Sequence, residues 1–240
     1  MSNFVINPYR YGVAFPDPHL WYDFADISTI TKSGSNLVSS VENKGDAGFD
    51  APLTNSGSTQ PLWVSSGQNG NNDINFAGNK FLATDIAQFD IQLFSPFITF
   101  IVCQAGDNSG TDPSPFGFIK DAAYQGDFYC PRTYIAPGNQ FYLHQIGLSE
   151  FTETGIIDTW HVWTAVCVSG ASSLRMDGVE KASNTSTGSS DPKQMFVGTN
   201  HLANSFLDRP IGEIKIYNEE LTTDQIETIE ADLKTKWGTP

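Results

Sequence analysis

Cysteine is scarce in this chain of 240 residues, which contains only Cys103, Cys130 and Cys167. An odd number cannot pair completely, and the three positions match the spacing of neither a disulfide framework nor a zinc site. Cys103 and Cys167 lie inside apolar runs, where a reduced cysteine packs as a small hydrophobic residue. We therefore expect reduced cysteines and predict no metal.

Long apolar segments are also missing, because no run approaches the roughly 20 residues that a membrane helix needs. The first residues, MSNFVINPYRYGVAF, lack the basic region followed by an apolar stretch that marks a secretory signal. We expect no membrane insertion, no signal peptide and synthesis in a cytoplasm.

Basic residues are few. Lys and Arg number 13 against 27 Asp and Glu, which gives a formal net charge of -14. A chain with this charge is repelled by phosphate backbones and by anionic membrane surfaces. We therefore predict no binding to nucleic acid, and the acidity itself is explained by solubility.

Recognisable catalytic motifs are absent too. The four histidines, His19, His144, His161 and His201, do not have the spacing of metal ligands. No G-x-S-x-G elbow, P-loop or dinucleotide fingerprint occurs. We predict no catalytic residues and no cofactor, and we interpret His161, inside an apolar run, as structural.

The most informative stretch that is present runs from Asp208 to Gly238. Residues 212–217 alternate like a strand, with Gly212, Ile214 and Ile216 expected on one face. The period then changes to that of a helix, and the apolar positions form one stripe. Thr222 and Gln225 have the spacing of a capping box at its start. This pattern predicts a strand followed by a single short C-terminal helix.

The rest of the chain is typical of a β-rich protein. Two runs, Phe97–Cys103 and Trp160–Val168, are apolar on both faces, so we expect central strands that are covered on both sides. Asp177-Gly178 predicts a two-residue hairpin turn. The length suits one large sandwich domain, and no linker divides the chain.

Several segments resemble one known family, in its order along the chain. These are LWYDFAD at Leu20–Asp26, the segment Gln60–Leu82 with its Asn69-Gly70 turn, and GEIKIYN at Gly212–Asn218. The sequence resembles the concanavalin A-like (laminin-G-like) jelly-roll domains of phage and bacterial surface proteins. The resemblance implies an all-β, antiparallel β-sandwich jelly roll over residues 19–240, with one short C-terminal helix.

The resemblance leaves function open, because this fold hosts lectins, glycanases and structural modules. Glycanases of this fold carry paired carboxylates in a Glu-x-Asp-x-Glu-like run on one strand, and that run is absent. We therefore predict that the protein is not an enzyme.

Residues 1–18 precede the resemblance and are rich in proline and aromatic residues, so we predict an extended N-terminal arm. Its candidate assembly residues are Phe4, Tyr9, Arg10 and Tyr11. Two interpretations are open: the aromatic residues cover an edge of the sandwich, or they dock on a neighbouring subunit.

A second stretch has the chemistry of sugar binding, which combines aromatic faces with planar polar groups. The candidates for glycan binding are Tyr124, Tyr129, Tyr134, His144 and Asp112. The same aromatic residues are equally compatible with burial.

The polar loop 67–78 has too few carboxylates for a calcium site. In that loop we expect Asp73 and Asn75 to point outward if Ile74 and Phe76 point inward.

Two functional hypotheses follow. The first is a non-enzymatic virion surface or structural protein, such as a phage capsid decoration or fibre-associated module. It would be a homo-oligomer that contacts other capsid or tail proteins through its arm. The alternative is a carbohydrate-binding adhesion module that recognises cell-surface glycans.

Overall fold

The computed structural model describes residues 15–46, 51–85, 96–105, 114–118, 156–168, 170–185, 194–199 and 205–240 in full. For residues 93–94, 119, 126–134, 140–144, 151–152 and 189–190 it describes the backbone alone.

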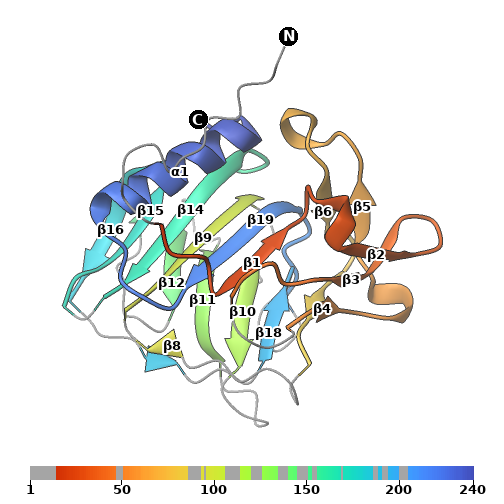
Figure 1. Cartoon of the computed structure of the whole chain (residues 1–240), viewed down its shortest axis with the longest axis horizontal. Helices are drawn as coiled ribbons and strands as arrows, with labels where there is room; N and C mark the ends of the chain where they lie inside the picture. The colour runs from red at the N-terminus through yellow and green to blue at the C-terminus, as the bar shows by residue number, and fades with distance from the viewer. Residues whose placement is uncertain are drawn as a thin grey trace.

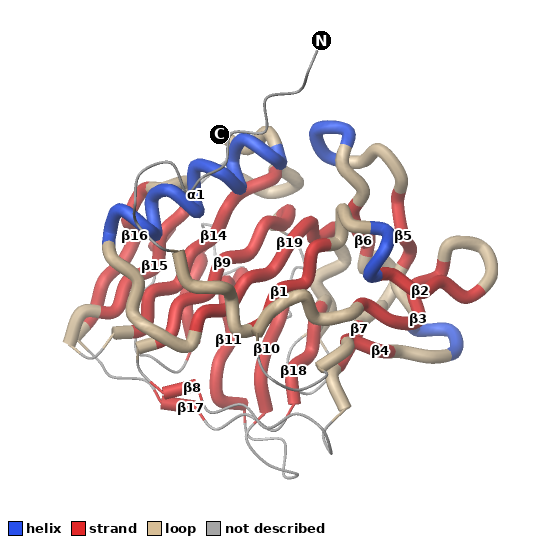
Figure 2. The backbone as a smooth tube through the Cα atoms, in the orientation of Figure 1, coloured by secondary structure: helices blue, strands red, loops and turns tan. Residues whose placement is uncertain are grey.

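The described chain folds as two facing layers of β-strands, all paired antiparallel in the named ladders, with one α-helix at the C-terminus (Figures 1 and 2). The first layer contains β16, β15, β14, β9, β19 and β1, in that order of neighbours, and the second contains β7, β18, β10, β11, β12 and β13. Strands β2 to β6 gather at one side of the sandwich and join the two layers. The predicted antiparallel β-sandwich is therefore confirmed.

The strands of the first layer are β1 (Leu20–Asp23), β9 (Phe97–Gln104), β14 (Trp160–Cys167), β15 (Ser172–Met176), β16 (Val179–Asn184) and β19 (Pro210–Tyr217). Those of the second are β7 (Leu82–Ala83), β10 (Phe116–Ile119), β11 (Gly126–Tyr134), β12 (Gln140–His144), β13 (Phe151–Thr152) and β18 (Gln194–Val197). The joining strands are β2 (Ile30–Ser33), β3 (Leu37–Val41), β4 (Leu53–Thr54), β5 (Leu62–Val64) and β6 (Asp73–Asn75). A separate pair is formed by β8 (Leu93–Phe94) and β17 (Ser189–Ser190). Three short 3-10 turns lie at η2 (Ile27–Thr29), η3 (Gly57–Thr59) and η4 (Gln68–Gly70). The helix is α1 (Thr223–Trp237).

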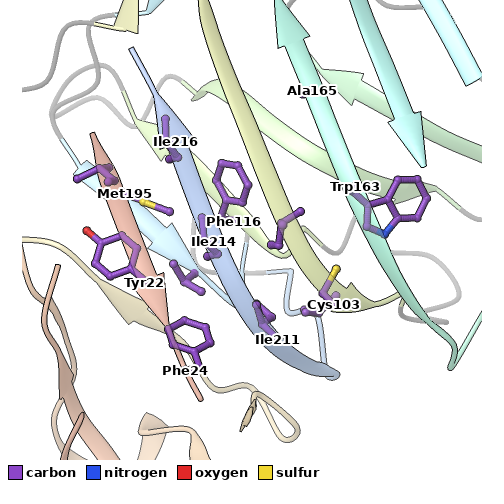
Figure 3. Close-up of a cluster of buried hydrophobic side chains, with 14 of the residues drawn as sticks. Tyr22, Phe24, Cys103, Phe116, Trp163, Ala165, Met195, Ile211, Ile214 and Ile216 are labelled. Atoms are coloured by element: carbon purple, nitrogen blue, oxygen red, sulfur yellow. The ribbon is translucent and has the colours of Figure 1, made fainter. Parts of the chain in front are cut away.

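The core between the layers is built from alternate residues of the central strands. Along β9, Ile101 and Cys103 face the second layer, and along β14 Trp163 and Ala165 do so. They meet Phe116 and other side chains of the second layer (Figure 3). Both strands are buried along their whole described length apart from the partly exposed Gln104. The prediction of two strands covered on both sides is confirmed.

The other face of β9 and β14 is covered by α1, which lies across it in Figure 1. Phe100 of β9 and Val162 of β14 belong to the same buried cluster as Ile226, Leu233 and Trp237 of the helix.

The Thr222–Gln225 capping box begins the helix, and Gly238, in the left-handed conformation at φ 61°, ends it. The helix is thus confirmed. Among the described helices, none is long and apolar enough to cross a membrane.

The β19 strand contains a bulge that corrects one sequence expectation. Ile211 pairs with Cys103, but Glu213 pairs with the next residue, Val102, so Gly212 is the extra residue. A Cβ on Gly212 would lie 2.6 Å from the Trp237 ring, so Gly212 faces the helix. The expectation that Gly212 shares a face with Ile214 was wrong, because the bulge shifts the alternation by one residue and makes room for the indole.

A buried carboxylate ties this region together. Glu213 is 1% exposed and accepts hydrogen bonds from Trp21 Nε1 at 2.8 Å, Lys236 Nζ at 2.6 Å and Trp237 Nε1 at 3.1 Å. Burial acts to raise the pKa of Glu213, but the ammonium groups of Lys215 and Lys236 outweigh it, so the pKa is lowered. This carboxylate holds β1, β19 and the end of α1 in one arrangement.

Candidate functional site

A hollow of about 510 Å³ lies at one corner of the sandwich, where strand ends from several elements meet. Gln104 ends β9 and is the pairing partner of Trp160, which begins β14. Because β19 runs antiparallel to β9, its first residue, Pro210, lies at the same end and pairs with Asn75 of β6. We call this hollow the corner pocket and define it by Asp73, Asn75, Gln104, Trp160, Asp208 and Arg209.

Trp160 is the one aromatic residue among the described residues that line the corner pocket. Its ring stacks on that of Trp237, with centroids 5.7 Å apart and planes at 12°. The residue is 9% exposed, so most of the indole is fixed in the cluster beneath α1. The Trp160 ring is therefore rigid, and a ligand meets it without loss of side-chain freedom.

Asp73 is the most unusual group in the corner pocket. It is 4% exposed, and burial raises its pKa to about 6, against the opposing effect of a hydrogen bond from the Gln68 backbone N–H. That hydrogen bond, to Oδ2, is long at 3.4 Å. Gly67 packs directly against the carboxylate, since a Cβ there would overlap Oδ2.

The placement of Asp73 corrects the expectation of an outward-pointing residue. Ile74 and Phe76 do enter the core, so Asp73 does lie on the opposite face of its strand. That face is largely covered by the loop at Gly67–Gln68, which leaves Asp73 4% exposed, at the corner pocket. This loop is in turn held against α1 by side-chain amides: Asn69 and Asn71 donate to the Lys236 carbonyl oxygen at 3.0 and 2.6 Å.

Two carboxamides complete the polar lining. Asn75 uses its Oδ1 to accept the Ala77 N–H at 2.8 Å, which fixes the side chain. The Gln104 side chain is partly exposed and makes no hydrogen bond to any other described residue. A carboxamide offers both a donor and an acceptor, so Gln104 has both available for a ligand.

The only cation lining the described part of the corner pocket is already neutralised. Arg209 Nε donates to Asp158 Oδ1 at 2.5 Å, and Arg209 Nη1 donates to the Asp208 carbonyl oxygen at 2.8 Å. Asp208, at φ 56°, accepts the Gly78 N–H at 2.6 Å. The pocket is thus polar and weakly acidic. No group of three His, Cys, Asp or Glu side chains among the described residues is arranged to hold a metal ion.

A second polar cluster, on β14, is explained by structure. His161 Nδ1 lies 2.6 Å from Asp177 Oδ2, and His161 Nε2 lies 2.6 Å from Thr159 Oγ1. The Thr159 hydroxyl also donates to the Ile156 carbonyl oxygen at 2.5 Å, and Asp177 Oδ1 accepts the Val162 N–H. Asp177 sits with Gly178 in the two-residue turn between β15 and β16, both at positive φ, as the sequence predicted. The cluster ties this turn to β14.

The sequence-predicted glycan residues lie elsewhere. Tyr129 of β11 and His144 of β12 are pairing partners in the second layer, and Tyr134 pairs with Gln140 at the other end of the same ladder. Their side chains are not among those described, and Tyr124 and Asp112 lie outside the described residues. The structure therefore brings Tyr129 and His144 together along the backbone.

The predicted arm residues Phe4, Tyr9, Arg10 and Tyr11 also lie outside the described residues. The described chain begins at Phe15, which packs against the cluster beneath α1.

No protein-family model and no curated protein sequence matches the chain. Solved structures do match. One is a Trypanosoma rangeli sialidase, at TM-score 0.59 and 12% identity, with 92% of this chain and 33% of that one covered. A second is the botulinum neurotoxin serotype G binding domain, at TM-score 0.56 and 13% identity, with 93% and 54% covered.

The match to a third solved structure covers the whole of that structure. It is domain 4 of AbnA, an extracellular arabinanase from Geobacillus stearothermophilus, in complex with arabinotriose, at TM-score 0.50 and 12% identity, with 90% of this chain covered. The chain thus spans about half of the toxin domain and a third of the sialidase. At these identities the matches show the fold, a β-sandwich, and nothing further.

Proposed function

We propose that this protein is a non-enzymatic carbohydrate-binding module and that the corner pocket is its binding site. One observation carries the proposal: the corner pocket is lined both by Trp160, whose ring is fixed by stacking on Trp237, and by Asp73 and Gln104. The side chains of Asp73 and Gln104 can form further hydrogen bonds with a ligand. A sugar presents an apolar face and a rim of hydroxyls, and this combination complements both.

The structural neighbours support the same class of ligand. The arabinanase domain was solved with arabinotriose, and a botulinum neurotoxin serotype D ligand-binding domain, at TM-score 0.52 and 13% identity, with N-acetylneuraminic acid. This support is an analogy of fold, since the same fold carries other functions. It favours the carbohydrate hypothesis over a virion structural role.

The test is a glycan array probed with the wild-type chain and two groups of variants. Gln104→Ala together with Asn75→Ala changes the corner pocket, while Tyr124→Ala, Tyr129→Ala and Tyr134→Ala change the stretch singled out in the sequence. We expect the first group to abolish the array signal and the second to preserve it. Loss of signal in the tyrosine group alone, at unchanged thermal stability, would move the site to β11 and β12.

Assembly on a virion surface through residues 1–18 is a separate proposal, motivated by the family resemblance and the composition of the arm. Size-exclusion chromatography with light scattering on the full chain and on residues 19–240 tests it. A defined oligomer that is lost with the arm supports it. A monomer in both cases contradicts it and leaves the carbohydrate proposal standing.

A further inference from the structure

The Asp73 carboxylate lacks the donors that a buried carboxylate needs. A carboxylate offers about four acceptor positions, and leaving a buried charge without partners is costly. Asp73 receives one hydrogen bond from the described chain, and that bond is long at 3.4 Å. Oδ1 accepts none from the described residues, although the side chain lines the corner pocket.

The protein offers no cation to fill this role. Arg209 is engaged by Asp158 and by the Asp208 carbonyl oxygen, and no lysine lines the corner pocket in the described part of the chain. A bound metal is disfavoured because few ligand oxygens are available. Asp208 is the second acidic residue of the lining, and its Oδ1 already accepts a hydrogen bond from the Gly78 N–H. Neutral O–H or N–H groups can fill these positions, either from water in the free protein or from a ligand that displaces it.

The charge around the corner pocket sets a second condition. Asp73 and Asp208 both line it, its arginine is neutralised, and the whole chain has a net charge of -14. A sugar that carries a carboxylate would bring a like charge beside a buried acid, which is unfavourable in a site of low polarisability. A neutral sugar meets no such repulsion.

We propose that the corner pocket selects neutral saccharides, with the Asp73 carboxylate accepting hydrogen bonds from sugar hydroxyls, and that it discriminates against sialylated or uronic-acid glycans. This inference rests on the proposed carbohydrate function and deepens it. Gln104 donates to or accepts from a neighbouring hydroxyl, and Trp160 contacts the apolar face of the sugar ring. The selectivity is opposite to that suggested by the sialic acid ligand of the toxin domain.

The experiment uses matched glycan pairs on an array, each pair differing only in a terminal sialic or uronic acid, followed by calorimetry with the strongest neutral binder. We expect neutral members to be preferred by about tenfold or more, and Asp73→Asn to lose about tenfold in affinity, since hydrogen bonds to a charged group are the strong ones. The matched control is Asp232→Asn, the same change at an exposed position of α1, which should bind like the wild type.

The outcomes separate the two proposals. If no glycan of either kind binds, the carbohydrate function itself fails. If glycans bind but the acidic members are preferred, or Asp73→Asn binds as well as the Asp232→Asn control, the carbohydrate function stands and the role of Asp73 is wrong. Thermal melting of Asp73→Asn guards against misfolding, because removal of a buried charge should leave the variant at least as stable as the wild type.

Discussion

Two buried carboxylates, Glu213 and Asp73, lie in the same part of the sandwich and have opposite environments. Glu213 is 1% exposed and receives three hydrogen bonds, from two indoles and an ammonium group. Asp73 is 4% exposed and receives a single long hydrogen bond from a backbone amide. The pKa of Glu213 is lowered by its lysine neighbours despite burial, whereas burial raises that of Asp73 to about 6.

The difference separates a structural acid from a candidate ligand-binding acid. A charge that is fully paired inside a protein helps to define one arrangement of the chain, and removal of its partner is costly. A charge that is buried without partners lowers stability in the free protein and is compensated when a ligand supplies the donors. The following substitutions test this contrast.

The largest effect is expected from Glu213→Gln. The substitution leaves the Lys236 ammonium with Asp23 as its remaining acid partner and weakens the hydrogen bonds from Trp21 and Trp237. We expect a loss of about 3 kcal/mol in the free energy of unfolding, measured by denaturant titration. Because the folded pKa of Glu213 is lowered, its contribution is present above the unfolded pKa and is lost as the pH falls. An exposed matched change, Glu180→Gln, should cost little, and equal stability of both variants would contradict a structural role for Glu213.

A somewhat smaller loss is expected from Gly212→Ala. The new Cβ would lie 2.6 Å from the Trp237 ring, a fixed group stacked on Trp160, so the indole or the β19 bulge must move. Overpacking of this kind costs about 1–3 kcal/mol. Thermal melting measures the loss, and tryptophan fluorescence should report the displaced indole. An unchanged melting temperature would show that the bulge does not depend on glycine.

Asp73→Asn should act in the opposite direction and stabilise the fold. The folded pKa of about 6 exceeds the ordinary value of 3.8, so folding costs free energy once the unfolded carboxyl ionises. Full stability is therefore present below about pH 4 and is lost as the pH rises through about 6. At pH 7 we expect Asp73→Asn to gain about 1–3 kcal/mol in unfolding free energy, and at pH 3.5 almost nothing. Denaturant titration at both pH values checks this, and a variant less stable at pH 7 would show that the carboxylate is structurally paired.

The smallest change in stability is expected from Gly67→Ala. Its Cβ would overlap Asp73 Oδ2, but this atom is the end of a side chain that can rotate away. We expect a loss of at most about 1 kcal/mol, as for many surface changes, together with a clear loss of affinity for neutral glycan. Calorimetry and thermal melting on the same sample separate the two effects. Full affinity would mean that the position of the Asp73 carboxylate does not matter for binding.

The sequence predicted the parts of the fold that depend on periodicity and local chemistry. The α1 helix, with its capping box and its terminal Gly238, and the two strands that are buried on both faces follow from spacing alone. The bulge at Gly212 was missed, although the core residues Ile211 and Ile214 stand three positions apart and so break the two-residue alternation. The reason for a glycine at this position is the Trp237 ring, which fills the space beside it and lies 25 positions further along the chain.

The candidate site was less predictable than the fold. The sequence drew attention to Asp73 only as part of a poor calcium loop, and Trp160 only as a core residue. Their meeting with Gln104 depends on the antiparallel order of β9, β14 and β19 and on the pairing of β6 with β19. Strand order of this kind is a long-range property. The only local signal was a lone carboxylate between the glycines of the segment 67–78.

The most direct test of the central claim is a crystal structure of the chain with the strongest neutral glycan from the array. We predict density for a sugar in the corner pocket, with a hydroxyl within hydrogen-bonding distance of Asp73 and the apolar face of the ring against Trp160. Density for the sugar over β11 and β12, with the corner pocket filled by water alone, would contradict the assignment of the site.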